Sequence, residues 1–157
     1  DRIVVMNDAR VQQIADPLTI ATRPETELVA RFMGDNNVLR GKVKTRDGDR
    51  LTVDTVGGTT VTAIAADFDG AVGDELLVSV RAAAARLDDG ASGGPNTAEC
   101  EIVFVEFLGD LVKLHLELGQ DRFLVKVPGE AYASLRGREG ERIRVAWKEE
   151  DVRLLRA

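Results

Sequence analysis

Cysteine and long apolar runs are scarce in this chain, and each shortage excludes a class of protein. The single cysteine, Cys100, cannot form an internal disulfide framework. The longest apolar runs, such as residues 102–105, are far shorter than the roughly 18 to 20 residues that span a bilayer. The first residues also lack the charged stretch, apolar run and cleavage site of a secretion signal. We therefore expect a soluble, cytosolic protein.

Basic and aromatic residues are too few for a nucleic-acid-binding protein. The chain has 21 lysines and arginines against 27 aspartates and glutamates, which gives a formal net charge of -6. Binding to a phosphate backbone relies on clustered lysine and arginine, and binding to single strands adds aromatic stacking. Aromatic residues make up only 4% of the chain. Nucleic acid is therefore not expected among its partners.

Residues that commonly carry catalysis are few, and each has a simpler structural interpretation. His115, the only histidine, alternates with leucines along residues 111–118 and is expected on the solvent face of a strand. Cys100 lies between Glu99 and Glu101, whose negative charges raise the pKa of a thiol and make it less reactive. Neither residue is expected to be functional.

The acidic and glycine-rich turns do not match ligand-binding motifs. Four carboxylates within residues 67–75 lack the spacing of an EF-hand. Neither Gly57-Gly58 nor the glycines of residues 90–94 are followed by Lys-Ser/Thr and a helix, as a phosphate-binding P-loop requires. The sequence therefore predicts no catalytic, cofactor-binding or metal-binding residues.

The first 35 residues predict a hairpin and two short helices. Apolar residues 3–6 and 11–14 flank a turn-prone four-residue connection, which suits a type I turn. Asp16-Pro17 is a good N-cap and first residue for one helix, and Pro24-Glu25 predicts the start of the second. Gly34 is expected to end that helix, which places a boundary near residue 35.

From residue 36 onward, short alternating segments separated by glycine and aspartate turns predict an all-β barrel or sandwich. Residues 88–96 are small, polar and glycine-rich, so we expect a flexible connector between two β segments. A short helix is expected near residues 130–135. The predicted strands are 51–56 and 60–64, which form a hairpin around Gly57-Gly58, followed by 76–80, 102–107, 112–118, 123–127 and 142–148.

The β region contains an internal repeat. Residues 73–87 align without gaps to residues 140–154, and the glycine, one valine and a final Arg-Leu coincide. The inward-facing set of Leu76, Val78 and Val80 then corresponds to Ile143, Val145 and Trp147, so the tryptophan is expected in the core. We expect a duplicated β unit whose two halves form one shared barrel.

The opening stretch "DRIVVMNDARVQQIADPLTIATRPETELVARFMGDNN" begins directly with a strand-like run. It resembles the end of the nucleotide-binding domain of ATP-binding-cassette (ABC) importer ATPases of the maltose, polyamine and ferric-ion group. In that family the run carries "DRI", "G-R-I-x-Q", "P-x-x-I-Y-x-x-P" and "F-I-G-x-x-N". Corresponding residues here are Asp1-Arg2-Ile3, Arg10-Val11, Gln13, Pro17, Ile20, Pro24, Phe32, Gly34 and Asn37, whereas Ala9, Ala15 and Thr22 depart from the pattern.

The rest of the chain resembles the C-terminal transport-associated OB (TOBE) domain of the same ATPases. The stretches "GDELLVSVR", "VEFLGDLVKLHLEL", "VKVPGEA" and "GERIRVAWKEEDVRLL" carry this resemblance. The family often has Arg-Pro-Glu after the first of these strands, but here Arg81 is followed by Ala82–Ala85. The resemblance implies a remnant of the nucleotide-binding domain at residues 1–35. It also implies an OB-fold-like TOBE barrel at residues 36–157, with its connector at 88–97.

The resemblance also implies what this chain does not do by itself. ATP and Mg²⁺ would be bound by a domain that precedes Asp1, so this fragment is expected to lack ATP hydrolysis. We expect a regulatory domain that pairs with a second copy and, through the parent ATPase, with membrane permease subunits at the inner face of the membrane. Candidate interface or ligand residues are Leu77, Arg81, Gly109, Asp110 and Leu124, of which Leu77 and Leu124 are expected to be exposed.

An alternative is a sensor that binds a small ligand or oxyanion at a subunit interface. Related TOBE pairs in oxyanion systems imply such a site. Backbone amides near Gly109, Gly119 or Gly129 would supply it, although the acidic balance of the chain is unfavourable to anions.

Overall fold

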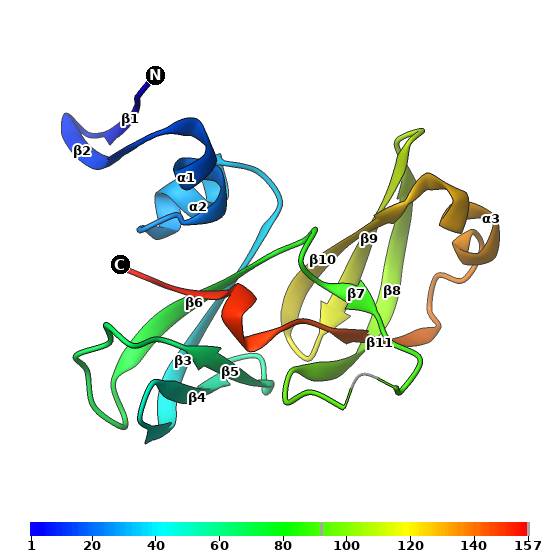
Figure 1. Cartoon of the computed structure of the whole chain (residues 1–157). Helices are drawn as coiled ribbons and strands as arrows, with labels where there is room; N and C mark the ends of the chain where they lie inside the picture. The colour runs from blue at the N-terminus through cyan, green and yellow to red at the C-terminus, as the bar shows by residue number, and fades with distance from the viewer. Residues whose placement is uncertain (92, 157) are drawn as a thin grey trace.

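A computed structural model describes residues 1–91 and 93–156, and it places an N-terminal segment beside two β-sheets (Figure 1). The N-terminal segment holds a hairpin of β1 (Ile3–Asn7) and β2 (Arg10–Ala15), followed by helices α1 (Pro17–Thr22) and α2 (Glu27–Phe32). No helix in the described part of the chain is long and apolar enough to cross a membrane.

The first hairpin has a tighter turn than the sequence predicted. Asp8 and Ala9 have φ angles of 48° and 59°, so they form a two-residue turn of the I′ kind between the strands. A type I turn over four residues was therefore the wrong prediction, because the primed turn matches the twist of the two strands. Asp8 tolerates the left-handed conformation better than most residues.

The two short helices begin at different kinds of cap. Asp16 accepts hydrogen bonds from the backbone N–H groups of Leu18 and Thr19 at 3.0 Å, as predicted for α1. The second helix starts later than Pro24-Glu25, because the hydroxyl of Thr26 caps it by accepting from Val29 N at 3.3 Å. The start of α2 was therefore predicted two to three residues too early.

Each of the two sheets has five antiparallel strands (Figure 1). The first sheet has the order β12-β6-β3-β4-β5 and the second has the order β10-β9-β8-β11-β7. The predicted hairpin, the predicted strands and the short helix near residue 130 are all present, and β3, β7 and β12 are additional. The bounds are β3 (Asn36–Asp47), β4 (Arg50–Thr55), β5 (Thr60–Ile64), β6 (Glu75–Arg81), β7 (Arg86–Leu87), β8 (Thr97–Phe107), β9 (Leu111–Leu118), β10 (Asp121–Pro128), η1 (Gly129–Ala131), α3 (Tyr132–Leu135), β11 (Arg142–Ala146), η2 (Glu149–Asp151) and β12 (Val152–Leu155).

Strand register shows that the two sheets are copies of one unit. Leu76 pairs with Gly41 on β3, and its repeat partner Ile143 pairs with Cys100 on β8. Each sheet has a β-bulge that begins two residues after this partner: after Val43 on β3, and after Ile102 on β8. The predicted duplication is therefore present at the level of hydrogen-bond register, and bulges are features that related sheets keep.

The short strand after each repeat joins the opposite sheet. Leu87, which follows β6 of the first repeat, pairs with Val145 on β11 of the second. Leu154, its counterpart in the second repeat, pairs with Val78 on β6 of the first. Each sheet is thus completed by a strand that belongs in sequence to the other repeat. The two halves are interlocked rather than placed in series.

One large hydrophobic core fills the space between the sheets. It includes Val53 and Val78 from the first sheet and Leu116 and Phe123 from the second. Trp147 lies in it as predicted, with its ring 5.1 Å from that of Phe123. The apolar faces of the two sheets therefore pack on each other in one core.

Leu77 is buried, contrary to the prediction that it is exposed. Its side chain is only 5% accessible and packs with Ala30 of α2 and Leu155 of β12. Both faces of β6 are therefore covered, one by the main core and the other by α2, and β12 continues the sheet beside β6. The sequence alternation around Leu77 showed one buried face, but it did not show that the N-terminal segment covers the second.

Candidate functional site

Two buried asparagines join the halves of the barrel at equivalent positions. Asn37 precedes Val38 on β3, and its side-chain Nδ2 donates to Leu124 O at 2.9 Å while its Oδ1 accepts from Leu124 N at 2.6 Å. Asn96, just before β8, makes the same pair of bonds with Thr62 O and Thr62 N, both at 2.7 Å. Each amide side chain therefore replaces a strand partner for the edge strand of the other sheet. We call these two pairs the asparagine clasps.

The turns beside the clasps contact each other. Gly57 lies between β4 and β5, and Gly119 lies at the equivalent place between β9 and β10. A Cβ on Gly119 would lie 2.0 Å from Gly57 O, and a Cβ on Gly57 would lie 2.0 Å from the carboxylate of Asp121. Gln120 N also donates to Gly57 O at 3.2 Å. Only glycine allows these two turns to approach so closely.

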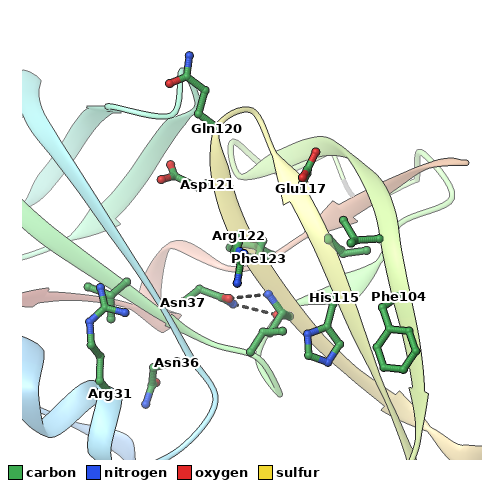
Figure 2. A pocket seen from close by; sticks show the side chains of 14 residues that line it. Arg31, Asn36, Asn37, Phe104, His115, Glu117, Gln120, Asp121, Arg122 and Phe123 are labelled. Carbon is green, nitrogen blue, oxygen red and sulfur yellow. Dashed lines mark hydrogen bonds between the residues drawn. The ribbon is translucent and has the colours of Figure 1, made fainter. Parts of the chain in front are cut away.

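An open cavity of about 640 Å³ lies next to the first clasp. We call it the central pocket; Figure 2 shows its lining and the two hydrogen bonds of Asn37. Its walls come from the end of α2, the first residues of β3 and the strands β8, β9 and β10. The lining residues are Arg31, Asn36, Asn37, Val38, Val103, Phe104, His115, Leu116, Glu117, Gln120, Asp121, Arg122, Phe123 and Leu124.

Charges of both signs face the central pocket. Arg31 is already paired, because its guanidinium contacts Glu27 at 2.8 Å. Arg122 has no ion pair among the described residues. Burial raises the pKa of the Asp121 carboxyl, and the Gly57 backbone partly offsets this effect. The oxygens Asn36 Oδ1 and Asp121 Oδ2 are buried and have no hydrogen-bond partner in the described structure. The pocket can therefore offer hydrogen-bond acceptors as well as the guanidinium of Arg122.

His115 and Phe104 form one wall of the pocket. Their rings are tilted with centroids 5.6 Å apart, and Nε2 of His115 lies 2.9 Å from Glu106 Oε2. His115 lies on the outward face of β9 as predicted, where these neighbours partly cover it. A single histidine beside one carboxylate and one phenyl ring, without a nucleophile, is not a catalytic arrangement.

A polar junction ties the start of the β region to the second sheet. The Asp35 carboxylate lies 3.1 Å from Lys113 Nζ and 2.8 Å from Lys126 Nζ. The hydrogen bond from Lys126, followed by that from Lys113, holds the pKa of Asp35 below its ordinary value. Asp35 O also accepts from Ala82 N at 2.8 Å, which connects the junction to the residues after β6.

The residues predicted as interface or ligand candidates are not gathered in one place. Leu124 lines the central pocket and is half-buried rather than exposed, and its backbone is held by Asn37. Arg81 is exposed at the end of β6, and Leu77 lies in the core. Gly109 and Asp110 form the turn between β8 and β9, at the tip of that hairpin. Of the five, only Leu124 belongs to the pocket.

The described residues contain neither a metal-ligating cluster nor a reactive thiol. No group of three or more His, Cys, Asp or Glu side chains comes close enough there to hold a metal ion. Burial raises the pKa of the Cys100 thiol to about 12, so the thiol is unreactive. The cause is burial, and not the neighbouring glutamates that the sequence suggested. The acidic turn before β6 is structural, because Asp74 accepts from Ala71 N at 2.8 Å.

Sequence reasoning missed the two asparagine clasps. Asn37 was identified only as part of the family resemblance. Asn96 was predicted in a flexible connector, although its side chain is 1% exposed and makes two hydrogen bonds to the backbone of Thr62. A polar residue in a polar stretch carries no sign of burial. The strand register shows their equivalence, because Asn37 lies four residues before Gly41 and Asn96 lies four residues before Cys100, and these two residues pair with the repeat partners Leu76 and Ile143. The gap-free sequence alignment has a different offset and does not bring the two asparagines together.

Comparison with known proteins identifies the family to which this architecture belongs. The family model described as "TOBE domain" matches residues 78–155. The chain is 35% identical over 148 residues to the spermidine/putrescine import ATP-binding protein PotA of Rubrobacter xylanophilus, covering 94% of this chain and 38% of that protein. It is 29% identical over 152 residues to the putrescine transport ATP-binding protein PotG of Escherichia coli, covering 94% and 40%.

A solved structure supports the fold assignment. The cytoplasmic molybdate-binding protein ModG, in a form with molybdate bound, superposes with a TM-score of 0.65 over 75% of this chain and 94% of its own, at 22% identity. The chain spans about two fifths of the length of the curated relatives that it matches. The chain belongs to the ATP-binding subunits of ABC importers, of which it is the C-terminal part containing the TOBE domain.

Proposed function

We propose that this chain is the non-catalytic, regulatory part of the ATP-binding subunit of an ABC importer for a small solute. The observation that carries the proposal is the similarity to PotA and PotG, which extends over 94% of the chain. ATP and Mg²⁺ would be bound by a part of the longer protein outside these residues. That protein would work at the cytoplasmic face of the membrane with permease subunits.

The outer face of the N-terminal hairpin supports attachment to an ATPase domain. Val4 and Ile14 pair across β1 and β2, as do Met6 and Val11, and all four side chains are about half exposed. The opposite face of the hairpin packs on Ile20 and Val29. A two-stranded sheet is marginally stable without a further layer. We propose that the ATPase domain covers the exposed face.

A second copy of the protein is the partner that we propose for the outer face of β8. Val103, Phe104, Phe107 and Leu108 are each about half exposed along this strand and its turn. Such a cluster of apolar side chains is a common sign of an interaction surface. The pairing surface is therefore proposed here and not at Leu77, which the core already covers.

The decisive experiment uses the full-length gene product. We expect it to hydrolyse ATP and to be dimeric by light scattering at micromolar concentration. The double substitution Phe104→Ser/Phe107→Ser should shift it toward monomer while thermal unfolding stays cooperative. Matched substitutions at exposed polar positions, Glu99→Ser and Glu101→Ser, should leave the mass unchanged. A full-length protein without ATPase activity would contradict the parentage, and an unchanged dimer would contradict this surface.

Sensing of a small ligand in the central pocket is the second candidate. The unpaired oxygens of Asn36 and Asp121 and the guanidinium of Arg122 favour it. The ModG structure holds molybdate, so an oxyanion is one ligand to test, and a polyamine is another. Calorimetry with molybdate, sulfate and spermidine should give heat that Arg122→Gln or Asp121→Asn lowers. Absence of heat with all three ligands would remove this candidate.

A further inference from the structure

Three arginines converge at the seam between the N-terminal segment and the end of the chain. Arg23 follows α1, whereas Arg153 and Arg156 lie on and just after β12. Together with Pro24, Glu25 and Leu154 they line an open depression of about 610 Å³. The chain end runs beside the helices (Figure 1), where Thr26 and Arg156 form a parallel β-bridge. We call this the arginine seam.

The arginine seam has an excess of positive charge in a protein whose net charge is -6. Among the described residues, Glu25 is the only carboxylate in its lining, and it pairs with Arg156. Arg153 donates from Nη1 to the carbonyl oxygens of Glu150 at 2.6 Å and Val152 at 3.4 Å, which leaves its other N–H groups available. Arg23 has no ion pair or side-chain hydrogen bond within the described ranges. Two guanidinium groups therefore face the depression without a carboxylate.

A buried glutamine fixes the loop that carries Arg23. Gln13 is 4% exposed; its Nε2 donates to Arg23 O at 2.9 Å, and its Oε1 accepts from Glu25 N at 3.0 Å. Arg23 N also donates to Thr19 O at 2.7 Å. On the opposite side, Arg156 N donates to Glu25 O at 2.8 Å, which fixes the end of β12. The backbone of the seam is thus held in place before any ligand arrives, which lowers the entropic cost of binding.

We propose that the arginine seam is a binding site for a tetrahedral oxyanion of the phosphate class. Guanidinium groups match the oxygens of phosphate and sulfate with paired N–H donors. An oxyanion here would be shared by Arg23 from the N-terminal segment and Arg153 from β12. Binding would therefore hold the two segments together and stabilise the chain against unfolding. The site is separate from the central pocket and does not depend on the proposed function.

The test is a titration of the full-length gene product with inorganic phosphate and sulfate at constant ionic strength, followed by calorimetry and by the midpoint of thermal unfolding. We expect saturable binding and a rising midpoint. Arg23→Gln and Arg153→Gln should each weaken binding by about tenfold, the factor expected for the loss of one charge-assisted hydrogen bond. Arg153→Lys keeps the charge without the planar fork and should recover only part of the affinity.

A control variant and a nucleotide separate the alternatives. Arg142→Gln, whose side chain is 76% exposed, should bind phosphate as the unchanged protein does. Adenosine monophosphate distinguishes a free anion from a phosphate group of a larger ligand, and either result supports the site if Arg23→Gln weakens it. Binding that does not saturate, or that responds equally to Arg142→Gln, would show only screening by salt and would overturn the proposal.

Discussion

Replacing Asn37 with alanine tests whether the asparagine clasps hold the halves together. Asn37 is 3% exposed, and the substitution removes its bonds of 2.6 and 2.9 Å to the backbone of Leu124. A hydrogen bond contributes about 1 kcal/mol net, and a buried partner left unpaired costs about 1–3 kcal/mol. Because Leu124 is only half-buried, water can rehydrate part of its backbone. We expect a loss of about 2–3 kcal/mol in the free energy of unfolding.

A loss of this size is measurable without destroying the fold. Domains of this length lose about 2–4 °C in melting temperature per kcal/mol, so the midpoint should fall by about 4–12 °C. Urea unfolding monitored by Trp147 fluorescence gives the free energy, and an unchanged slope shows that the native state stays compact. Asn96→Ala should cost about the same, since Asn96 makes the equivalent pair of bonds to Thr62. The double variant should be additive, because the clasps share no partner.

Two further variants sharpen this test. Asn37→Asp keeps an acceptor for Leu124 N but places a carboxylate oxygen against Leu124 O, so it should be at least as destabilising as alanine. Asn7→Ala is the matched control, because the amide of Asn7 reaches only Asp8 in an exposed turn. If Asn37→Ala and Asn7→Ala lower the free energy of unfolding equally, the clasps do not hold the halves together.

Three other predictions concern Gly119, Asp35 and Cys100. In urea unfolding, Gly119→Ala should lower the free energy of unfolding by about 1–3 kcal/mol more than Gly109→Ala does. Both glycines have a positive φ angle, but only a Cβ at residue 119 would clash with Gly57 O, so equal losses would contradict the close approach. The stability difference between the unchanged chain and Asp35→Asn should be full near pH 7 and should shrink as the pH falls through the lowered pKa of the Asp35 carboxyl. A carboxyl whose pKa is lowered in the folded state stabilises the fold above its unfolded-state pKa and stops doing so when it is protonated, so a difference that persists at low pH would refute this. Cys100 should resist a thiol reagent at pH 8 until urea unfolds the chain, and rapid labelling of the native protein would show that the core around it opens.

The repeat and most strands were predictable because their signals are local. Alternation along residues 111–118 and the glycines that bracket the hairpins are read directly from neighbouring residues. The alignment of residues 73–87 with 140–154 even placed Leu76 and Ile143 correctly at the same step of the register. What it could not show was the exchange of β7 and β12, because a two-residue strand has no pattern of its own.

The remaining errors came from contacts between distant segments. Leu77 alternates like a solvent-facing residue, and only the packing of Ala30 and Leu155 on it reverses that expectation. The central pocket is likewise formed by α2, β3 and three strands of the second sheet, which lie far apart in the chain. Such sites depend on topology, and local propensity carries no information about them.

The interlocked topology limits how a signal can pass between the N-terminal segment and the barrel. The contacts that join them include the packing of Ala30 on Leu77 and Leu155, the Asp35 carboxylate between two lysines, and the backbone bridge of Thr26 with Arg156. Two of these contacts end on β6 or β12 in the first sheet, and the third ends on β9 and β10 in the second. Because β12 belongs in sequence to the second repeat, displacement of α2 would strain both repeats at once. A movement of the N-terminal segment would therefore shift the barrel as one body, since a packed core shared by both sheets resists deformation within it.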